Sequence, residues 1–149
     1  MTNTNSAHWP IFGFAVLLLF ISLPFPVFET INPEGDFEAR CHGWEALLVG
    51  WFGVLAGCLA WLANPLSLLV AVLLHFKKWS NAFIAASVAA CCALTTLFIY
   101  KPIPTGEPFE NVLCIGAWFW FASIACVWFS SFVARRNAPS VHQAEPISE

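Results

Sequence analysis

Charge is what this sequence has least of. Asp, Glu, Lys and Arg make up 10% of its 149 residues, whereas about a quarter of a soluble domain is charged. Hydrophobic residues reach 59%, and the mean hydropathy is +0.73. The six Lys and Arg stand singly or in pairs, which excludes the basic face of a nucleic-acid-binding protein. This composition predicts an integral membrane protein whose main partner is the lipid bilayer.

Motifs for catalysis or ligand binding are also missing. The sequence contains no phosphate-binding glycine loop, no G-x-G-x-x-G, no H-E-x-x-H, no G-x-S-x-G and no C-x-x-C. We therefore expect no enzyme and no cofactor. Six cysteines raise the alternative of a quinone-linked thiol oxidoreductase, but Cys91 and Cys92 are adjacent in the middle of a charge-free run, where thiols pack as small apolar side chains.

Long charge-free runs locate the expected membrane spans. Each run exceeds the roughly 20 apolar residues that cross a bilayer. We predict an all-α bundle of four transmembrane helices, forming one domain over residues 1–134, with a polar cytoplasmic tail over 135–149. The spans are expected at about residues 10–23, 46–76, 81–100 and 111–133.

The run over 46–76 is too long for a straight span. Its 31 residues would measure about 46 Å as a helix, against a hydrocarbon core of about 30 Å. Asn64-Pro65 lies near its middle, and an interior proline bends a helix. We predict one long crossing bent there, which could begin as an interfacial helix at Trp44. Two short crossings that turn at Asn64 would give five spans instead, although residues 65–76 are below spanning length.

Basic residues orient the predicted bundle. In the four-span topology Lys77, Lys78, Arg135 and Arg136 lie on one side, and Arg40 and Lys101 lie on the other. Cytoplasmic loops carry the excess of Lys and Arg. Both termini are therefore expected in the cytoplasm, with the acidic loops on the outer face.

Small residues recur at alternating steps of four and three in the second span. This 3.5-residue repeat is typical of a helix seam that lets another backbone come close in lipid. The predicted helix-packing seam consists of Ala46, Gly50, Gly53, Gly57, Ala60, Asn64, Ser67 and Ala71. A matching stripe in the third span consists of Ala82, Ala86, Ala89, Ala93 and Thr96. We expect these two helices to pack on each other, and Asn64 to repair backbone groups near Pro65 or to bond to the third span.

Two polar groupings fall on the predicted outer face. Cys41 and Cys114 could form a disulfide if the compartment is oxidising. His42 and Glu45 share a helix face and could bind a divalent metal, but a polar helix start with Glu45 near the positive end of the dipole explains them better, so we predict no metal. The full outer-face polar patch is Asp36, Glu38, Arg40, His42, Glu45, Glu107 and Glu110.

One set of residues resembles a known pattern. The run Gly43-Trp44-Glu45, Gly50-Trp51 and Ala60-Trp61-Leu62-Ala63-Asn64-Pro65 looks like a motif of small, uncharacterised bacterial inner-membrane proteins with several spans. The resemblance covers about a quarter of the chain and implies the fold and the bacterial inner membrane, with no activity to carry over.

Two classes of function remain open. The first is a non-enzymatic interaction protein that binds another membrane protein, and one form of it is an immunity protein against a membrane-active toxin. The second is a transporter, a channel or an accessory subunit of a membrane complex, in which the seam forms a pathway or a homo-oligomer contact. Drug/proton exchangers place a glutamate inside the first span, whereas this first span has no ionisable group and Glu45 lies at the edge of the second.

Overall fold

Helices make up most of the structure, a computed structural model that describes residues 7–31, 37–55, 59–99 and 110–138. The protein is thus mostly helical, as the all-α prediction requires, but it also contains a small sheet that this prediction did not include. The elements of the described residues are α1 (His8–Ser22), β1 (Pro26–Ile31), β2 (Phe37–His42), α2 (Gly43–Leu55), a 3-10 helix η2 (Leu59–Leu62), α3 (Ala63–His75), α4 (Trp79–Ile99), β3 (Glu110–Leu113) and α5 (Ile115–Arg136). Two of them, α4 and α5, are long and apolar enough to cross a membrane.

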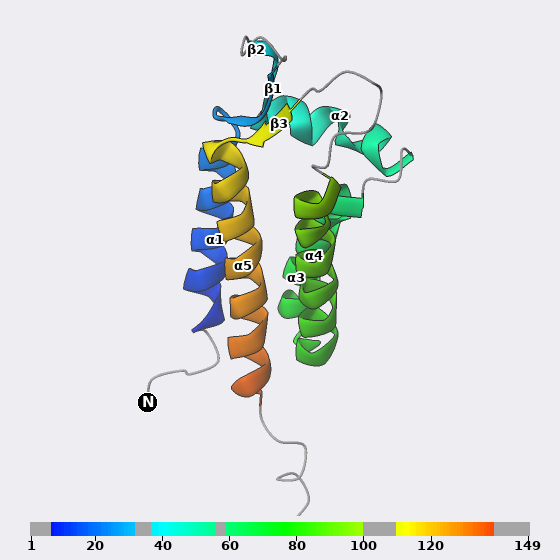
Figure 1. Cartoon of the computed structure of the whole chain (residues 1–149). Coiled ribbons are helices and arrows are strands. Elements are labelled where there is room, and N and C mark those ends of the chain that lie inside the picture. The colour runs from blue at the N-terminus through cyan, green and yellow to red at the C-terminus, as the bar shows by residue number, and fades with distance from the viewer. Residues whose placement is uncertain (1–6, 32–36, 56–58, 100–109, 139–149) are drawn as a thin grey trace, which may run out of the picture.

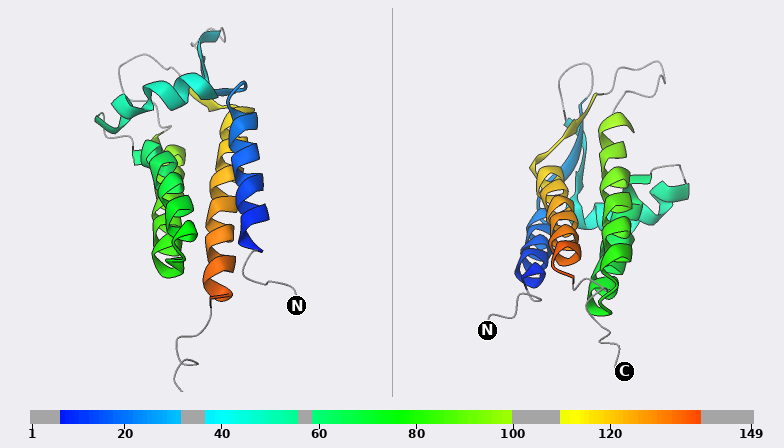
Figure 2. Two further views of the ribbon diagram at one scale, coloured as in Figure 1. Left: turned by 180° about the vertical axis from the view of Figure 1, so that it is seen from behind. Right: turned by 90° about the horizontal axis from the view of Figure 1, so that it is seen from below.

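Two antiparallel helix pairs form the bundle. α1 packs on α5, and α3 packs on α4 as the sequence predicts, while α4 and α5 join the two pairs (Figure 1). The start of α1, the turn between α3 and α4, and the end of α5 lie at one end of the bundle (Figure 1). The sheet and α2 lie at the other end (Figures 1 and 2). We call these the turn end and the sheet end.

Small side chains fill the interior of the bundle. The stripe predicted in the third span is buried on α4 at all five positions, because Ala82, Ala86, Ala89, Ala93 and Thr96 are each 0–5% exposed. The largest apolar side chains that are almost fully buried in the described residues belong to Leu74, Ile124, Val70 and Val127, at 0–4% exposed. Large apolar side chains lie outside instead, and the most exposed of them are Phe20, Leu48, Phe52, Leu68 and Phe76 at 63–72%.

The long bent helix predicted over 46–76 is not formed. α2 ends at Leu55, α3 begins at Ala63, and α2 lies across the sheet end instead of along the bundle (Figures 1 and 2). Pro65 is therefore the third residue of a helix. The first backbone N–H groups of a helix have no partner within it, so a proline there costs no hydrogen bond. Asn64-Pro65 therefore lies in the first turn of α3, directly after η2, and not in the middle of one long helix.

A three-stranded antiparallel sheet stands where the sequence predicted irregular loops. Its strand order is β2-β1-β3, and Phe28 of β1 pairs with Cys41 of β2 on one side and Leu113 of β3 on the other. β1 starts at Pro26, just after the Pro24 that follows α1. Because β3 takes residues 110–113, α5 begins later than the predicted 111 and continues past 133 to Arg136.

Arg135 and Arg136 form the last turn of α5 instead of the start of a tail. Cations are favourable at the negative end of a helix dipole. The guanidinium of Arg135 also lies 5.0 Å from the centre of the Phe83 ring, a distance suited to a cation–π contact. These two interactions explain why the helix continues beyond the apolar run.

Candidate functional site

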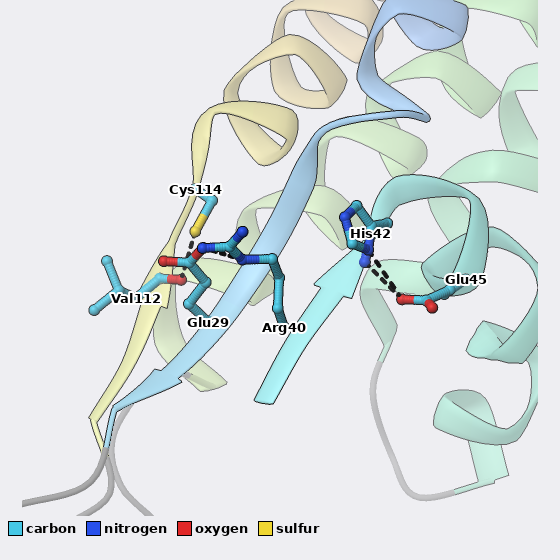
Figure 3. Close-up of polar contacts among 6 residues, drawn as sticks. All are labelled: Glu29, Arg40, His42, Glu45, Val112 and Cys114. Carbon is cyan, nitrogen blue, oxygen red and sulfur yellow. Dashed lines mark hydrogen bonds and ion pairs between the residues drawn. The ribbon is translucent and has the colours of Figure 1, made fainter. Parts of the chain in front are cut away.

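The charged residues of the sheet end are held in pairs by the sheet. Glu29 of β1 lies opposite Arg40 of β2 in the register, and Arg40 Nε lies 2.6 Å from Glu29 Oε1 (Figure 3). The Arg40 side chain is 52% exposed, and the Glu29 side chain is 14% exposed. Opposite charges at directly facing positions stabilise antiparallel strands, so this pair fastens β2 to β1 and presents a guanidinium at the surface.

His42, the last residue of β2, and Glu45, in the first turn of α2, lie on either side of the start of that helix. The backbone N–H of His42 donates to Glu45 Oε2 at 2.8 Å, and His42 Nδ1 lies 3.5 Å from the same oxygen (Figure 3). A glutamate that reaches back to the backbone N–H of the residue before its helix makes half of a capping box. This geometry accounts for both side chains. Among residues 7–31, 37–55, 59–99 and 110–138, no three metal-ligating side chains group together.

The structure describes only some of the other residues of the predicted outer-face polar patch. Glu38 lies in β2 and Glu110 lies in β3, where Glu110 pairs with Ile31 of β1. Asp36 and Glu107 lie outside the described residues. The sheet therefore carries Glu38, Arg40 and His42 on β2 and Glu110 on β3, with β1 between the two strands, and Glu45 follows on α2.

Cys41 and Cys114 are free thiols in the structure. Cys41 is on β2, and Cys114 directly follows β3 with its N–H donating to Val27 of β1. The strand β1 lies between them, so their Cα atoms are about two strand spacings, or about 10 Å, apart. A disulfide needs Cα atoms within about 7 Å. The structure thus does not bring the expected disulfide partners together.

The surroundings of both thiols disfavour the thiolate form and so raise the pKa of each. Burial raises the pKa of Cys41, and the negative charge of Glu45 raises it further. Burial also raises the pKa of Cys114, with a second contribution from Glu29 that Arg40 partly opposes. The Cys114 sulfur lies beside the Glu29–Arg40 pair (Figure 3) and donates weakly to the Val112 carbonyl at 3.6 Å. A raised pKa lowers the fraction of reactive thiolate.

The helix-packing seam is divided between three elements. On α2, Ala46 is buried with Val27 and Ala117, and Gly50 lies against the indole of Trp61. Ala60 is buried in η2. Gly53 lies in α2 with its surroundings undescribed, and Gly57 lies outside the described residues.

On α3, the inward face is not the predicted one. Ala63, Val70 and Leu74 are buried, whereas Asn64, Ser67 and Ala71 are half-buried. The Ser67 hydroxyl donates to the Ala63 carbonyl at 2.7 Å within the helix. A periodic pattern of residues predicts which side of a helix faces inward only within one continuous helix. Because the chain breaks between α2 and α3, the rotation of α3 about its own axis does not follow from the pattern on α2. The predicted face is therefore about one position off.

Asn64 bonds to α5, not to the third span. Trp120 Nε1 donates to Asn64 Oδ1 at 2.8 Å, which gives the half-buried amide a partner on the neighbouring helix. A second indole of α5 forms a hydrogen bond to α4, because Trp128 Nε1 donates to Ser87 Oγ at 3.1 Å. These two bonds join the helix pairs.

Two serines of α5 form hydrogen bonds to α1 that were not predicted from the sequence. Ser123 Oγ donates to the Ala15 carbonyl at 2.8 Å, and Ser130 Oγ donates to the His8 carbonyl at 2.9 Å, so both bond to α1. Both serines are buried. Their spacing of seven residues places them on one face of a helix, and this spacing was readable in the sequence.

In chemical terms, the described side chains hold elements together and expose an apolar surface with a polar cap. Glu29 neutralises Arg40, Glu45 caps α2, and the hydroxyls and indoles of α5 bond to neighbouring helices. No protein-family model, curated protein or solved structure matches the chain. The assignment of a function therefore rests on this geometry.

Proposed function

We propose that the protein is a multi-pass membrane protein with four membrane-crossing segments and both termini in the cytoplasm. The observation that carries this proposal is the inverted distribution of side-chain size, because most buried side chains of the bundle are Ala and Ser, whereas many Leu, Phe and Trp side chains are exposed. In water this arrangement would forfeit the hydrophobic effect. In lipid, close packing of small residues and bonds between helices are what hold a bundle together.

The lengths of the four segments are compatible with this placement. α4 and α5, at 21 and 22 residues, measure about 32 Å each. η2 and α3 together are about 27 Å long, and the 15 residues of α1 are about 22 Å long. A short helix is accommodated by local thinning of the bilayer at modest cost.

Charge is divided between the two ends in the way the orientation requires. Lys77, Lys78, Arg135 and Arg136 are all exposed at the turn end. Residues 23–45 and 100–114, which join elements of the sheet end, hold seven acidic and two basic residues. Since basic residues mark the cytoplasmic side, the turn end faces the cytoplasm and the sheet end faces outward.

Within the membrane the protein works as a non-enzymatic interaction protein. At the outward end the charged groups with described side chains are the Glu29–Arg40 pair on the sheet and Glu45 at the start of α2. The surplus of acidic residues favours a cationic partner. One form of this function is an immunity protein of a bacterial inner membrane that binds a membrane-active toxin, which agrees with the motif around Gly43-Trp44-Glu45.

The alternative is a transporter, a channel or an accessory subunit. One observation favours it, because His8 Nε2 and Thr96 Oγ1 are buried without a hydrogen-bond partner in the described part of the chain. Unsatisfied polar atoms in a membrane bundle are costly and are often functional. The genes adjacent to this one discriminate between the two: a toxin gene favours immunity, and a transporter operon favours the subunit.

Topology reporters test the membrane placement. Reporters fused at the N-terminus and after Lys78 should both be cytoplasmic, because two crossings separate them, and a reporter after Thr105 should lie outside, because α4 is the one crossing between Lys78 and Thr105. An N-terminus and a Lys78 fusion on opposite sides would instead indicate five spans. A fully cytoplasmic, soluble fusion set would overturn the proposal.

A protection assay tests the interaction. Cells that express the chain should survive a toxin encoded by the adjacent gene, and Glu38→Gln combined with Glu110→Gln, which removes two acidic residues of the sheet, should reduce survival while the protein still accumulates in the membrane. Gly13→Ala is the matched control, since no atom lies within 4 Å of the position of its new Cβ. Equal survival with and without the chain would reject immunity.

A further inference from the structure

An exposed apolar stripe runs along α2, outside the helices of the bundle. Trp44, Leu48 and Phe52 follow one another at four-residue spacing and are 50%, 67% and 70% exposed, with Val49 beside them at 61%. Residues four apart lie on one face of a helix. In water such a patch would be a liability, so it requires a partner.

The opposite face of α2 is occupied by the protein itself. Ala46 is buried against Val27 and Ala117, and Gly50 is buried against Trp61. The helices of peripheral proteins at membranes direct a charged face to water. α2 does not need a charged face, because the face opposite its exposed apolar stripe packs on the sheet, on η2 and on the start of α5.

The position of α2 identifies the partner. Its 13 residues measure about 20 Å, which is too short to cross a bilayer, and it lies across the sheet end of the bundle (Figures 1 and 2). The paired charges of the sheet precede it in the chain. Large apolar side chains at the start of α5, Ile115 and Trp118, are exposed at the same end. α2 thus lies at the boundary between polar and apolar layers.

We propose that α2 lies flat in the membrane–water interface of the outer leaflet and that its stripe of Trp44, Leu48, Val49 and Phe52 contacts phospholipid. This inference rests on the proposed membrane placement. Trp44 is an amphipathic ring of the kind that is enriched at headgroup level. Because acidic residues outnumber basic ones at this end, apolar burial drives the contact, and attraction to anionic headgroups does not.

Site-specific photocrosslinking of the full chain tests the contact. A benzophenone amino acid replaces Leu48 or Phe52 in one chain at a time, in proteoliposomes of phosphatidylcholine. Both positions should form lipid adducts with a yield comparable to that of Ile84, a 58% exposed position of α4. The same label at Lys78, exposed at the turn end, should form adducts only at background level. Addition of phosphatidylglycerol should leave the yields at 48 and 52 unchanged.

The outcomes distinguish a failure of the interfacial position of α2 from a failure of the proposed membrane placement. Lipid adducts at Ile84 without lipid adducts at 48 and 52 would overturn the interfacial α2 and leave the membrane placement intact. Crosslinks from 48 and 52 to a second copy of the chain would overturn it as well, in favour of a dimer contact. Loss of lipid adducts at Ile84 would overturn the membrane placement itself. A yield that rises with phosphatidylglycerol would reject apolar burial as the driving force.

Discussion

At the scale of single residues, one glycine decides how α2 is attached. A Cβ added at Gly50 would overlap the rigid indole of Trp61, and overpacking of this kind costs about 1–3 kcal/mol. We expect Gly50→Ala to lower the thermal unfolding temperature in detergent and to reduce accumulation in the membrane.

Gly13→Ala is the control for that substitution. Its Cβ would meet no atom within 4 Å, so it should be neutral or stabilise α1 by up to about 1 kcal/mol through helix propensity. Equal unfolding temperatures for Gly50→Ala and the unmodified protein would show that α2 does not depend on this contact.

The thiol of Cys41 gives a prediction of pH dependence. Its raised pKa is due first to burial and then to Glu45, so alkylation, which requires the thiolate, should reach its half-maximal rate at a pH above that of an ordinary thiol. Glu45→Gln removes the negative charge and leaves an oxygen to accept from the His42 N–H. It should move this midpoint to lower pH, although not to the ordinary value, because the burial remains.

Mass spectrometry of alkylated peptides over a pH series would measure each thiol separately. Cys114 serves as the internal control, because its pKa responds to Glu29 and Arg40 and not to Glu45. A Cys41 midpoint that is unchanged by Glu45→Gln would contradict the proposed electrostatic contribution.

At the scale of elements, the end of α3 carries a strained residue. Lys77 has a φ of 59°, its N–H donates to the Leu74 carbonyl at 3.1 Å, and the N–H of Lys78 donates to the Leu73 carbonyl at 2.9 Å. This is a Schellman motif, in which the left-handed position is usually glycine. A side chain there costs about 1–2 kcal/mol.

Lys77→Gly should therefore raise the thermal unfolding temperature of the protein in detergent. Lys77→Ala is matched to it, since it removes the same charge but keeps the Cβ and hence the strain. An increase of the same size in both variants would mean that charge at the turn end, and not backbone strain, is responsible.

At the scale of the whole molecule, α5 holds the two helix pairs together. Its indoles bond to Asn64 of α3 and Ser87 of α4. Hydrogen bonds between membrane helices contribute about 0.6 kcal/mol on average, and the largest measured contribution is about 1.7 kcal/mol. A double-mutant cycle of Trp120→Phe with Asn64→Leu should give a coupling free energy of unfolding in this range.

Trp118→Phe combined with Asn64→Leu is the control cycle. Trp118 is 59% exposed and lies on the same helix, so its coupling to Asn64 should be near zero. A coupling for Trp120 no larger than that for Trp118 would show that the indole–amide bond does not join the pairs.

Much of the architecture follows from composition and spacing. The scarcity of charge and the stripe from Ala82 to Thr96 predicted apolar helices packed through small residues, and that stripe is buried on α4. This succeeds because side-chain size and the 3.6-residue period are local properties, which a continuous helix carries unchanged into the fold. Lys77 and Arg135 likewise lie at the same end because two helices, α4 and α5, follow one another between them, so the chain runs along the bundle and back.

Tertiary structure alone decided the rest. The break between α2 and α3, the sheet around β1 and the separation of Cys41 from Cys114 depend on which segments pair across the chain, and hydropathy does not encode pairing. Asn64-Pro65 illustrates the reason, because the same dipeptide bends a helix from within or begins one, and only the packing around it distinguishes the two. The partner of Asn64 was likewise settled by a residue 56 positions away in sequence, Trp120.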